Sequence, residues 1–115
     1  MLFDRCQLSI TPDDCNTKPT PQLVADYNKT DSSYLDNHFL EELYFNYGRY
    51  LLISCAQGIA LPSNLQGIWN YSNSAVWHCD IHANINVQMN YWPAEVTNLS
   101  ELHNNLLDYI YNEAL

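Results

Sequence analysis

Apolar side chains recur at steps of three and four residues in one stretch of this 115-residue chain, and this repeat constrains the fold more than any other feature. It predicts a long amphipathic helix with Asp36 as its N-cap and Gly58 as its C-terminal stop. A helix with one apolar face needs a neighbouring element to cover that face. The repeat consists of Leu40, Leu43, Tyr44, Tyr47, Tyr50, Leu51 and Ser54.

The segment before this helix is polar and contains three prolines, which break regular structure. We expect a long loop over residues 11–36, with one short helical turn near Leu23 to Tyr27. Residues 59–80 are also too irregular for a helix, although they contain large apolar side chains. An apolar loop of this kind must bury itself against another surface.

Two further helices are predicted in the C-terminal third. One covers about Ile85 to Val96 despite Pro93 inside it, and the other runs from Ser100, as N-cap, to near the C-terminus. The fold class is therefore all-α. Three amphipathic helices and two long loops leave apolar surface uncovered, which indicates a part of a larger domain.

Composition excludes several classes of function. With 47% hydrophobic and 15% charged residues the chain is globular, and its formal charge of −9 disfavours a nucleic-acid partner. No apolar run approaches the length of a membrane span. The four cysteines form no CxxC pair, so no metal site is expected, and pairing of Cys6 with Cys15 stays open beside free thiols.

Four sequence blocks, spread over nearly the whole chain, resemble consecutive motifs of glycoside hydrolase family 95. In order, they are LFDR at 2–5, LYFNYGRYLLIS at 43–54, LPSNLQGIWN at 61–70 and WHCDIHANINVQMNYWPAEVTNLSE at 77–101. The last block is long and rich in Trp, His and Asn, which makes a chance match very improbable. Two loops depart from the family pattern: Ala75 and Val76 replace a Pro-Pro pair, and residues 55–58 read CAQG.

The resemblance implies a fold and a reaction. The chain would be the N-terminal portion of an (α/α)6 barrel, with residues 1–36 as lead-in and loop, and residues 37–115 as barrel helices and active-site loops. Family members hydrolyse terminal α-linked L-fucose, often α-1,2-linked to galactose, with inversion and without a cofactor. The implied partners are a fucosylated glycan and the rest of the catalytic domain. The full-length protein would be secreted or periplasmic.

The resemblance also implies roles for four residues. Asn84 and Asn86 match an asparagine pair that holds the attacking water, and we expect both amides to point the same way from an extended segment. An amide is too weak a base to act alone, so its task is positioning. His82 is implied as a ligand of a sugar hydroxyl, and Trp77 as a wall of the sugar site. From the residues alone, His82 bonded to a backbone carbonyl and Trp77 as a loop anchor remain open.

The acid side of the reaction is expected elsewhere. The family's general acid Glu and catalytic Asp match positions beyond Leu115, so Glu95 is interpreted as structural. Trp69 is interpreted as a core residue, and Asn64 and Gln66 as braces of their own loop. An α-L-galactosidase and a non-catalytic sugar-binding remnant are the alternatives to a fucosidase.

Overall fold

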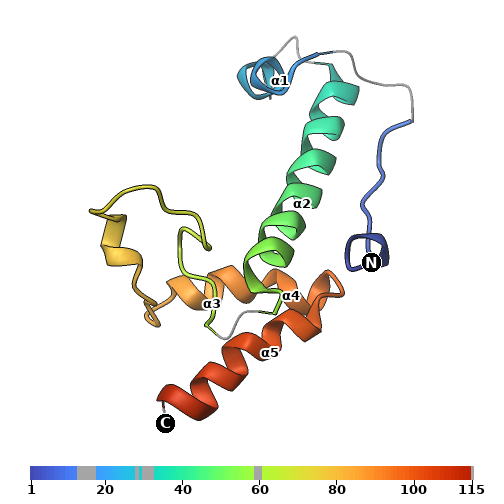
Figure 1. The fold of residues 1–115 in the computed structure, drawn as a ribbon. Coiled ribbons are helices and arrows are strands. Elements are labelled where there is room, and N and C mark those ends of the chain that lie inside the picture. Colours follow the sequence, from blue (N-terminus) through green and yellow to red (C-terminus); the bar gives the residue numbers. More distant parts are fainter. Residues whose placement is uncertain (13–17, 28, 30–32, 59–60, 115) are drawn as a thin grey trace. The chain divides into compact units, whose positions relative to one another are not determined.

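The computed structural model describes residues 1–115 except 13–17, 28, 30–32, 59–60 and 115, and it contains helices but no strand within those residues (Figure 1). The helical class predicted from the sequence is confirmed. The elements are η1 (Phe3–Arg5), α1 (Thr20–Asp26), α2 (Tyr34–Ala56), η2 (Val76–Cys79), α3 (Asn86–Tyr91), α4 (Pro93–Val96), α5 (Ser100–Tyr109) and the π-helical turn η3 (Ile110–Ala114).

The chain divides into two compact units. Unit 1 comprises Met1–Cys6 and Arg49–Leu115, and unit 2 comprises Gln7–Gly48. Helix α2 passes from unit 2 into unit 1. None of the helices that the structure describes is both long enough and apolar enough to cross a membrane.

Unit 1 is built around one apolar core. The end of α2 packs there with α3, α4 and α5. Helices α2, α3 and α5 each carry buried apolar residues three or four positions apart, and α4 adds Ala94. Full burial of one such large side chain contributes roughly 1.5–3 kcal/mol. The core consists of Leu52, Ile53, Ala56, Val87, Tyr91, Ala94, Leu99, Leu102 and Leu106.

Arg49 is the buried cation of unit 1. Its Nε donates to the carbonyl oxygen of Thr97 at 3.3 Å, and its Nη1 donates to those of Phe3 at 3.0 Å and Cys6 at 2.5 Å. Its Nη2 donates to the carbonyl oxygen of Leu2 at 2.9 Å. A guanidinium carries five donors in a rigid fork, so a single side chain can tie the lead-in segment to the end of α4.

The prediction of a single helix over about Ile85 to Val96 is wrong, because the structure has two short helices there. Helix α3 ends at Tyr91 and α4 begins at Pro93, with Trp92 between them. Proline has no N–H to continue the hydrogen-bond ladder of α3, but it is well suited to the first position of a new helix. Thr97 Oγ1 donates to the carbonyl oxygen of Pro93 at 2.7 Å and helps to end α4.

Helix α5 begins one residue earlier than predicted. Ser100 is its first residue, and Leu99, which makes no side-chain cap hydrogen bond, is the N-cap. Leu99 is fully buried, and its N–H donates to the carbonyl oxygen of Ala94 at 2.8 Å. The burial of Leu99 therefore fixes the start of the helix, and it overrides the better cap chemistry of serine.

Unit 2 has more helix than the sequence predicted. Instead of a short turn near Leu23 to Tyr27, helix α1 covers Thr20–Asp26, because Pro21 lies in its first turn, where proline is tolerated. Helix α2 begins at Tyr34, so Asp36 lies in the first turn and is not the N-cap. The carboxylate is still favoured there by the helix dipole.

The end of α2 agrees with the prediction. The helix stops at Ala56, and Gly58 follows with φ of +69°, a conformation that glycine adopts without strain. The predicted apolar stripe is not the buried face, since Tyr44 and Tyr47 are exposed and the buried residues cluster near the end of the helix. Cys15, the predicted alternative partner of Cys6, lies outside the described residues.

Candidate active site

Three consecutive residues at the start of the site, Trp77, His78 and Cys79, have a left-handed backbone, with φ values of 52°, 56° and 57°. Each non-glycine residue in this region costs roughly 1–2 kcal/mol. Within the turn, the His78 N–H donates to the carbonyl oxygen of Ala75 at 3.1 Å. The Asp80 N–H donates to that of Trp77 at 3.0 Å. Local turn bonds of this kind do not remove the steric cost of three left-handed residues, so the conformation depends on contacts from elsewhere in unit 1.

Those contacts come from the turn around Asn64. Asn64 Nδ2 donates to the carbonyl oxygen of Cys79 at 2.7 Å, and Gln66 Nε2 donates to that of Val76 at 2.9 Å. Asn64 Oδ1 also accepts from the Gln66 N–H at 2.9 Å, which is the loop-bracing bond that the sequence predicted. The two longer-range bonds go beyond that prediction, because they join two separate loops.

Helix α3 holds this turn in place. The Ser63 N–H donates to Tyr91 Oη at 2.9 Å, and Asn90 Nδ2 donates to the carbonyl oxygens of Ser63 and Asn64 at 3.2 and 3.0 Å. Burial raises the pKa of the Tyr91 phenol, which keeps the hydroxyl protonated. The turn is thus bonded on one side to α3 and on the other to the left-handed segment.

Gly67 closes the turn with φ of +62°, and a Cβ atom there would lie 2.6 Å from the ring of Trp69. The Trp69 ring therefore lies against the glycine backbone. Its side chain is 46% exposed, so the prediction that it is a core residue is wrong. The small glycine lets the ring cover the turn instead of entering the core.

One pocket of about 490 Å³ in unit 1 brings together all four predicted site residues. We call it the loop pocket, and its residues come from η2, from the loop that follows it and from the first residue of α3. Its lining residues are Trp77, His78, Asp80, His82, Asn84 and Asn86. Sequence reasoning gave no role to Asp80, although it stands two residues before His82 in the same alternating series as the asparagines.

The local backbone differs from the expected one. The asparagine pair is not on an extended segment, because Asn84 lies in a turn and Asn86 is the first residue of α3. The Val87 N–H donates to the carbonyl oxygen of His82 at 3.0 Å, which closes the turn. Both amides line the pocket through this turn-to-helix junction, so the expected convergence occurs for a different geometric reason.

His82 has an unusual environment. Its Nε2 is buried and has no hydrogen-bond partner within the described part of the chain. Its ring packs edge to face against the Trp77 ring, with the two ring centroids 4.6 Å apart. An unsatisfied buried polar atom costs about 1–3 kcal/mol. The alternative in which a backbone carbonyl satisfies the histidine fails at Nε2, which is buried without a partner among the described residues.

The other titratable groups near α3 and α4 do not join the pocket. His103 Nδ1 lies 2.9 Å from Glu95 Oε1, and neither residue lines the loop pocket. The structural role of Glu95 stays a prediction. Among the residues that the structure describes, no three His, Cys, Asp or Glu side chains are grouped to hold a metal ion.

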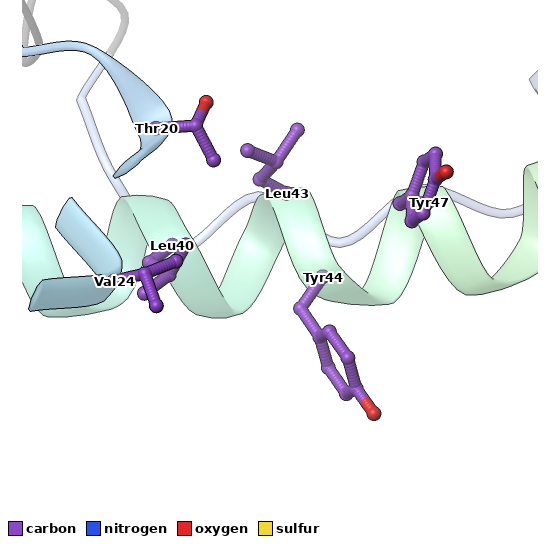
Figure 2. Close-up of a pocket in the computed structure, with 6 residues that line it drawn as sticks. All are labelled: Thr20, Val24, Leu40, Leu43, Tyr44 and Tyr47. Atoms are coloured by element: carbon purple, nitrogen blue, oxygen red, sulfur yellow. The ribbon is translucent and has the colours of Figure 1, made fainter. Parts of the chain in front are cut away.

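Unit 2 contains a second pocket, of about 360 Å³, which we call the α1–α2 pocket (Figure 2). Thr20 and Val24 from α1 line it together with residues one turn apart on α2. The α2 residues are Leu40, Leu43, Tyr44 and Tyr47. The lining is almost entirely apolar and contains no carboxylate, imidazole or amine.

The sequence profile of the Glycosyl hydrolase family 95 catalytic domain matches residues 1–114. The chain belongs to glycoside hydrolase family 95. Similar proteins include "Probable alpha-fucosidase A" of Aspergillus niger, 40% identical over 110 residues, which is 95% of this chain and 13% of that protein. "Probable alpha-fucosidase A" of Aspergillus oryzae is 47% identical over 90 residues, or 76% of this chain and 12% of that protein.

A plant relative of this family 95 chain is "Alpha-L-fucosidase 2" of Arabidopsis thaliana, 38% identical over 110 residues, which is 95% of this chain and 13% of that protein. The chain therefore spans about an eighth of the length of these family members. Its helical fold is consistent with part of the (α/α) barrel of the family.

Proposed function

We propose that this chain supplies the sugar-binding wall and the water-positioning amides of an α-L-fucosidase-like hydrolase that cleaves terminal α-1,2-linked L-fucose with inversion. One observation carries the proposal: Trp77, His82, Asn84 and Asn86 line a single pocket in unit 1. The names of the relatives support the substrate class.

Inverting hydrolysis needs an acid for the leaving oxygen and a base that activates water on the opposite face of the sugar. Asn84 and Asn86 hold that water, because each carboxamide accepts a hydrogen bond through oxygen and donates through NH2. Neither amide can take the proton. We propose that a carboxylate from another part of the catalytic domain does so, and that a Glu from the same part is the general acid.

The remaining pocket residues bind the sugar. His82 Nε2 gains its missing hydrogen bond from a sugar hydroxyl, and the Trp77 ring covers an apolar face of the sugar. The Asp80 carboxylate accepts from a second hydroxyl. These contacts exist in the ground state, so they contribute mainly to substrate affinity.

Turnover of an aryl α-L-fucoside by the complete catalytic domain that carries this segment tests the proposal. Proton NMR of the first product should show β-L-fucose, the inverted anomer. Appearance of the α anomer would overturn the inverting step. Faster cleavage of the matching α-L-galactoside would identify the alternative substrate, and L-fucose binding without turnover would identify a non-catalytic sugar-binding protein.

The 115-residue chain alone should give no measurable turnover. Loss of general acid catalysis costs on the order of 10²–10⁴ in rate. Turnover by the purified chain, abolished by Asn84→Ala, would show that the acid lies within these residues.

A further inference from the structure

The backbone of the pocket wall requires support that the wall does not itself supply. Trp77, His78 and Cys79 all have positive φ, and only short turn bonds join them to their neighbours. A run of non-glycine residues in this conformation persists only where the surroundings determine it. The ring of Trp77 can face His82 only as long as this backbone is held.

The turn around Asn64 provides a matched pair of contacts on the two sides of this run. Gln66 Nε2 holds the carbonyl oxygen of Val76, which precedes it, and Asn64 Nδ2 holds that of Cys79, which ends it. Both donors are side-chain amides from the same turn. The same turn is also hydrogen-bonded to Tyr91 and Asn90 of α3.

We propose that Asn64 and Gln66 act as positioning residues that hold the Trp77 ring against His82 and so set the shape of the sugar-binding wall. We call this pair of donors the amide clamp. Neither amide lines the loop pocket, so the clamp acts through the backbone of Val76 and Cys79. The effect of the amide clamp on catalysis rests on the function proposed above, but its effect on the position of the Trp77 ring does not.

The chain offers variants that replace each donor amide by a carboxylate of the same size, with a control that adds the same charge. Asn64→Asp keeps the Oδ1 that accepts from the Gln66 N–H but cannot donate to Cys79. Gln66→Glu likewise loses the hydrogen bond to the carbonyl oxygen of Val76. Because this bond is exposed, its loss should disturb the fold less than the loss of the part-buried bond from Asn64. Asn70→Asp is the control, because Asn70 makes the same kind of bond to Ser72 within its own exposed turn, outside the pocket.

The first measurement needs no substrate. In the complete catalytic domain labelled with 5-fluorotryptophan, the ¹⁹F resonance of Trp77 is assigned by its loss in Trp77→Phe. Asn64→Asp should shift or broaden this resonance, and Asn70→Asp should leave it in place. An unchanged Trp77 resonance in a folded Asn64→Asp protein overturns the clamp. If Asn64→Asp does not fold, the same comparison is made with Gln66→Glu.

The second measurement is a double-mutant cycle on KM and kcat for an aryl α-L-fucoside. Asn64→Asp should raise KM about 10-fold with kcat within about 3-fold, and most of this effect should vanish in the Trp77→Ala background. Equal KM effects in both backgrounds would mean that Asn64 only stabilises the fold, which overturns the inference. An inactive wild type would instead overturn the proposed function, and the ¹⁹F comparison would still decide the clamp.

Discussion

The two units place their pockets in opposite chemical settings. The loop pocket of unit 1 is lined by two histidines, two asparagines, an aspartate and a tryptophan, whereas the α1–α2 pocket of unit 2 is lined by leucines, tyrosines, a valine and a threonine. The first pocket contains groups that can bind a sugar and position water. The second is the partly covered apolar face of a helix. Volume alone does not separate them, so the lining chemistry is what makes the loop pocket the candidate site.

The units also differ in how they are held together. Unit 1 has the apolar core and the buried Arg49, whereas Leu23 is the one buried hydrophobic side chain among the described residues of unit 2. Unit 2 relies on polar contacts near the surface, such as Lys18 Nζ to Asp36 Oδ2 at 2.5 Å and Tyr27 Oη to Glu41 Oε1 at 2.8 Å. Exposed ion pairs contribute about 0–1 kcal/mol each. A pocket that depends on strained backbone therefore lies in the better-packed unit.

The largest expected effect tests this difference in packing. Arg49→Met should lower the free energy of unfolding by at least about 3 kcal/mol, because one buried and three part-buried hydrogen bonds to carbonyl oxygens lose their donor. Urea denaturation of the complete catalytic domain gives this value. Arg5→Met is the matched control: Arg5 is half exposed and pairs with Glu101, so its loss should cost less than about 1 kcal/mol. Equal losses would contradict the buried role of Arg49.

The second prediction concerns the loop pocket. Asn84→Ala or Asn86→Ala should lower kcat about 10²-fold, which raises the activation free energy by about 2.7 kcal/mol. The reason is that a misplaced water destabilises the transition state more than the ground state. His82→Ala should act mainly through KM, since its contact exists in the ground state.

The control for this prediction lies in the other pocket. Leu43→Ala in the α1–α2 pocket should leave kcat within about 3-fold, because no reacting group is near it. Steady-state kinetics on an aryl α-L-fucoside measure all four variants. Near-normal kcat in both asparagine variants would mean that the pair only stabilises the turn before α3.

A third prediction uses two glycines with opposite expected signs. Gly67→Ala should destabilise the protein by roughly 1–2 kcal/mol, because φ is +62° and the new Cβ would meet the Trp69 ring. Gly48→Ala should stabilise it by about 0.5–1 kcal/mol, because Gly48 lies inside α2 with nothing within 4 Å of the added atom. Thermal unfolding of both variants provides the comparison. Destabilisation by Gly48→Ala would show that its open surface is filled in the complete protein.

The sequence predicted the elements better than their boundaries. The long helix and its stop at Gly58 follow from periodicity and glycine chemistry, which are local properties. The buried N-cap Leu99 could not be predicted, because its position depends on burial within the core of unit 1. Similarly, Pro93 was read as tolerated within one helix, but the ladder breaks at the residue before it.

For the site, the family resemblance was enough to select four residues that do line one pocket. The expectation that Asn84 and Asn86 point the same way because they lie on an extended segment was wrong, since Asn84 lies in a turn and Asn86 begins α3. The bonds from Asn64 and Gln66 to the left-handed run could not be predicted, since they join residues 10 to 15 positions apart through backbone carbonyls. No sequence pattern records which carbonyl an amide reaches.

The smallest expected effect compares one exposed carboxylate from each unit. In unit 2, the hydrogen bond from Lys29 Nζ, 2.9 Å from Oδ1, is the main cause that lowers the pKa of Asp26. In unit 1, the pKa of Glu101 is lowered first by its own backbone N–H in the first turn of α5, and only then by Arg5. Lys29→Met should therefore return the pKa of Asp26 towards its ordinary value, whereas Arg5→Met should leave the pKa of Glu101 low.

Carboxyl ¹³C chemical shifts followed over an acid titration measure both pKa values. Because each folded-state pKa is lowered, the stabilisation is present above the ordinary carboxyl pKa and is lost as the pH falls through the folded-state value. In Lys29→Met this acid-dependent contribution from Asp26 should become smaller, while the contribution from Glu101 should persist in Arg5→Met. High salt should mimic the first substitution better than the second, since it screens an exposed ion pair but not a bond to the backbone. A Glu101 pKa that returns fully to its ordinary value in Arg5→Met would show that unit 1, like unit 2, relies on its surface ion pair and not on the helix N-terminus.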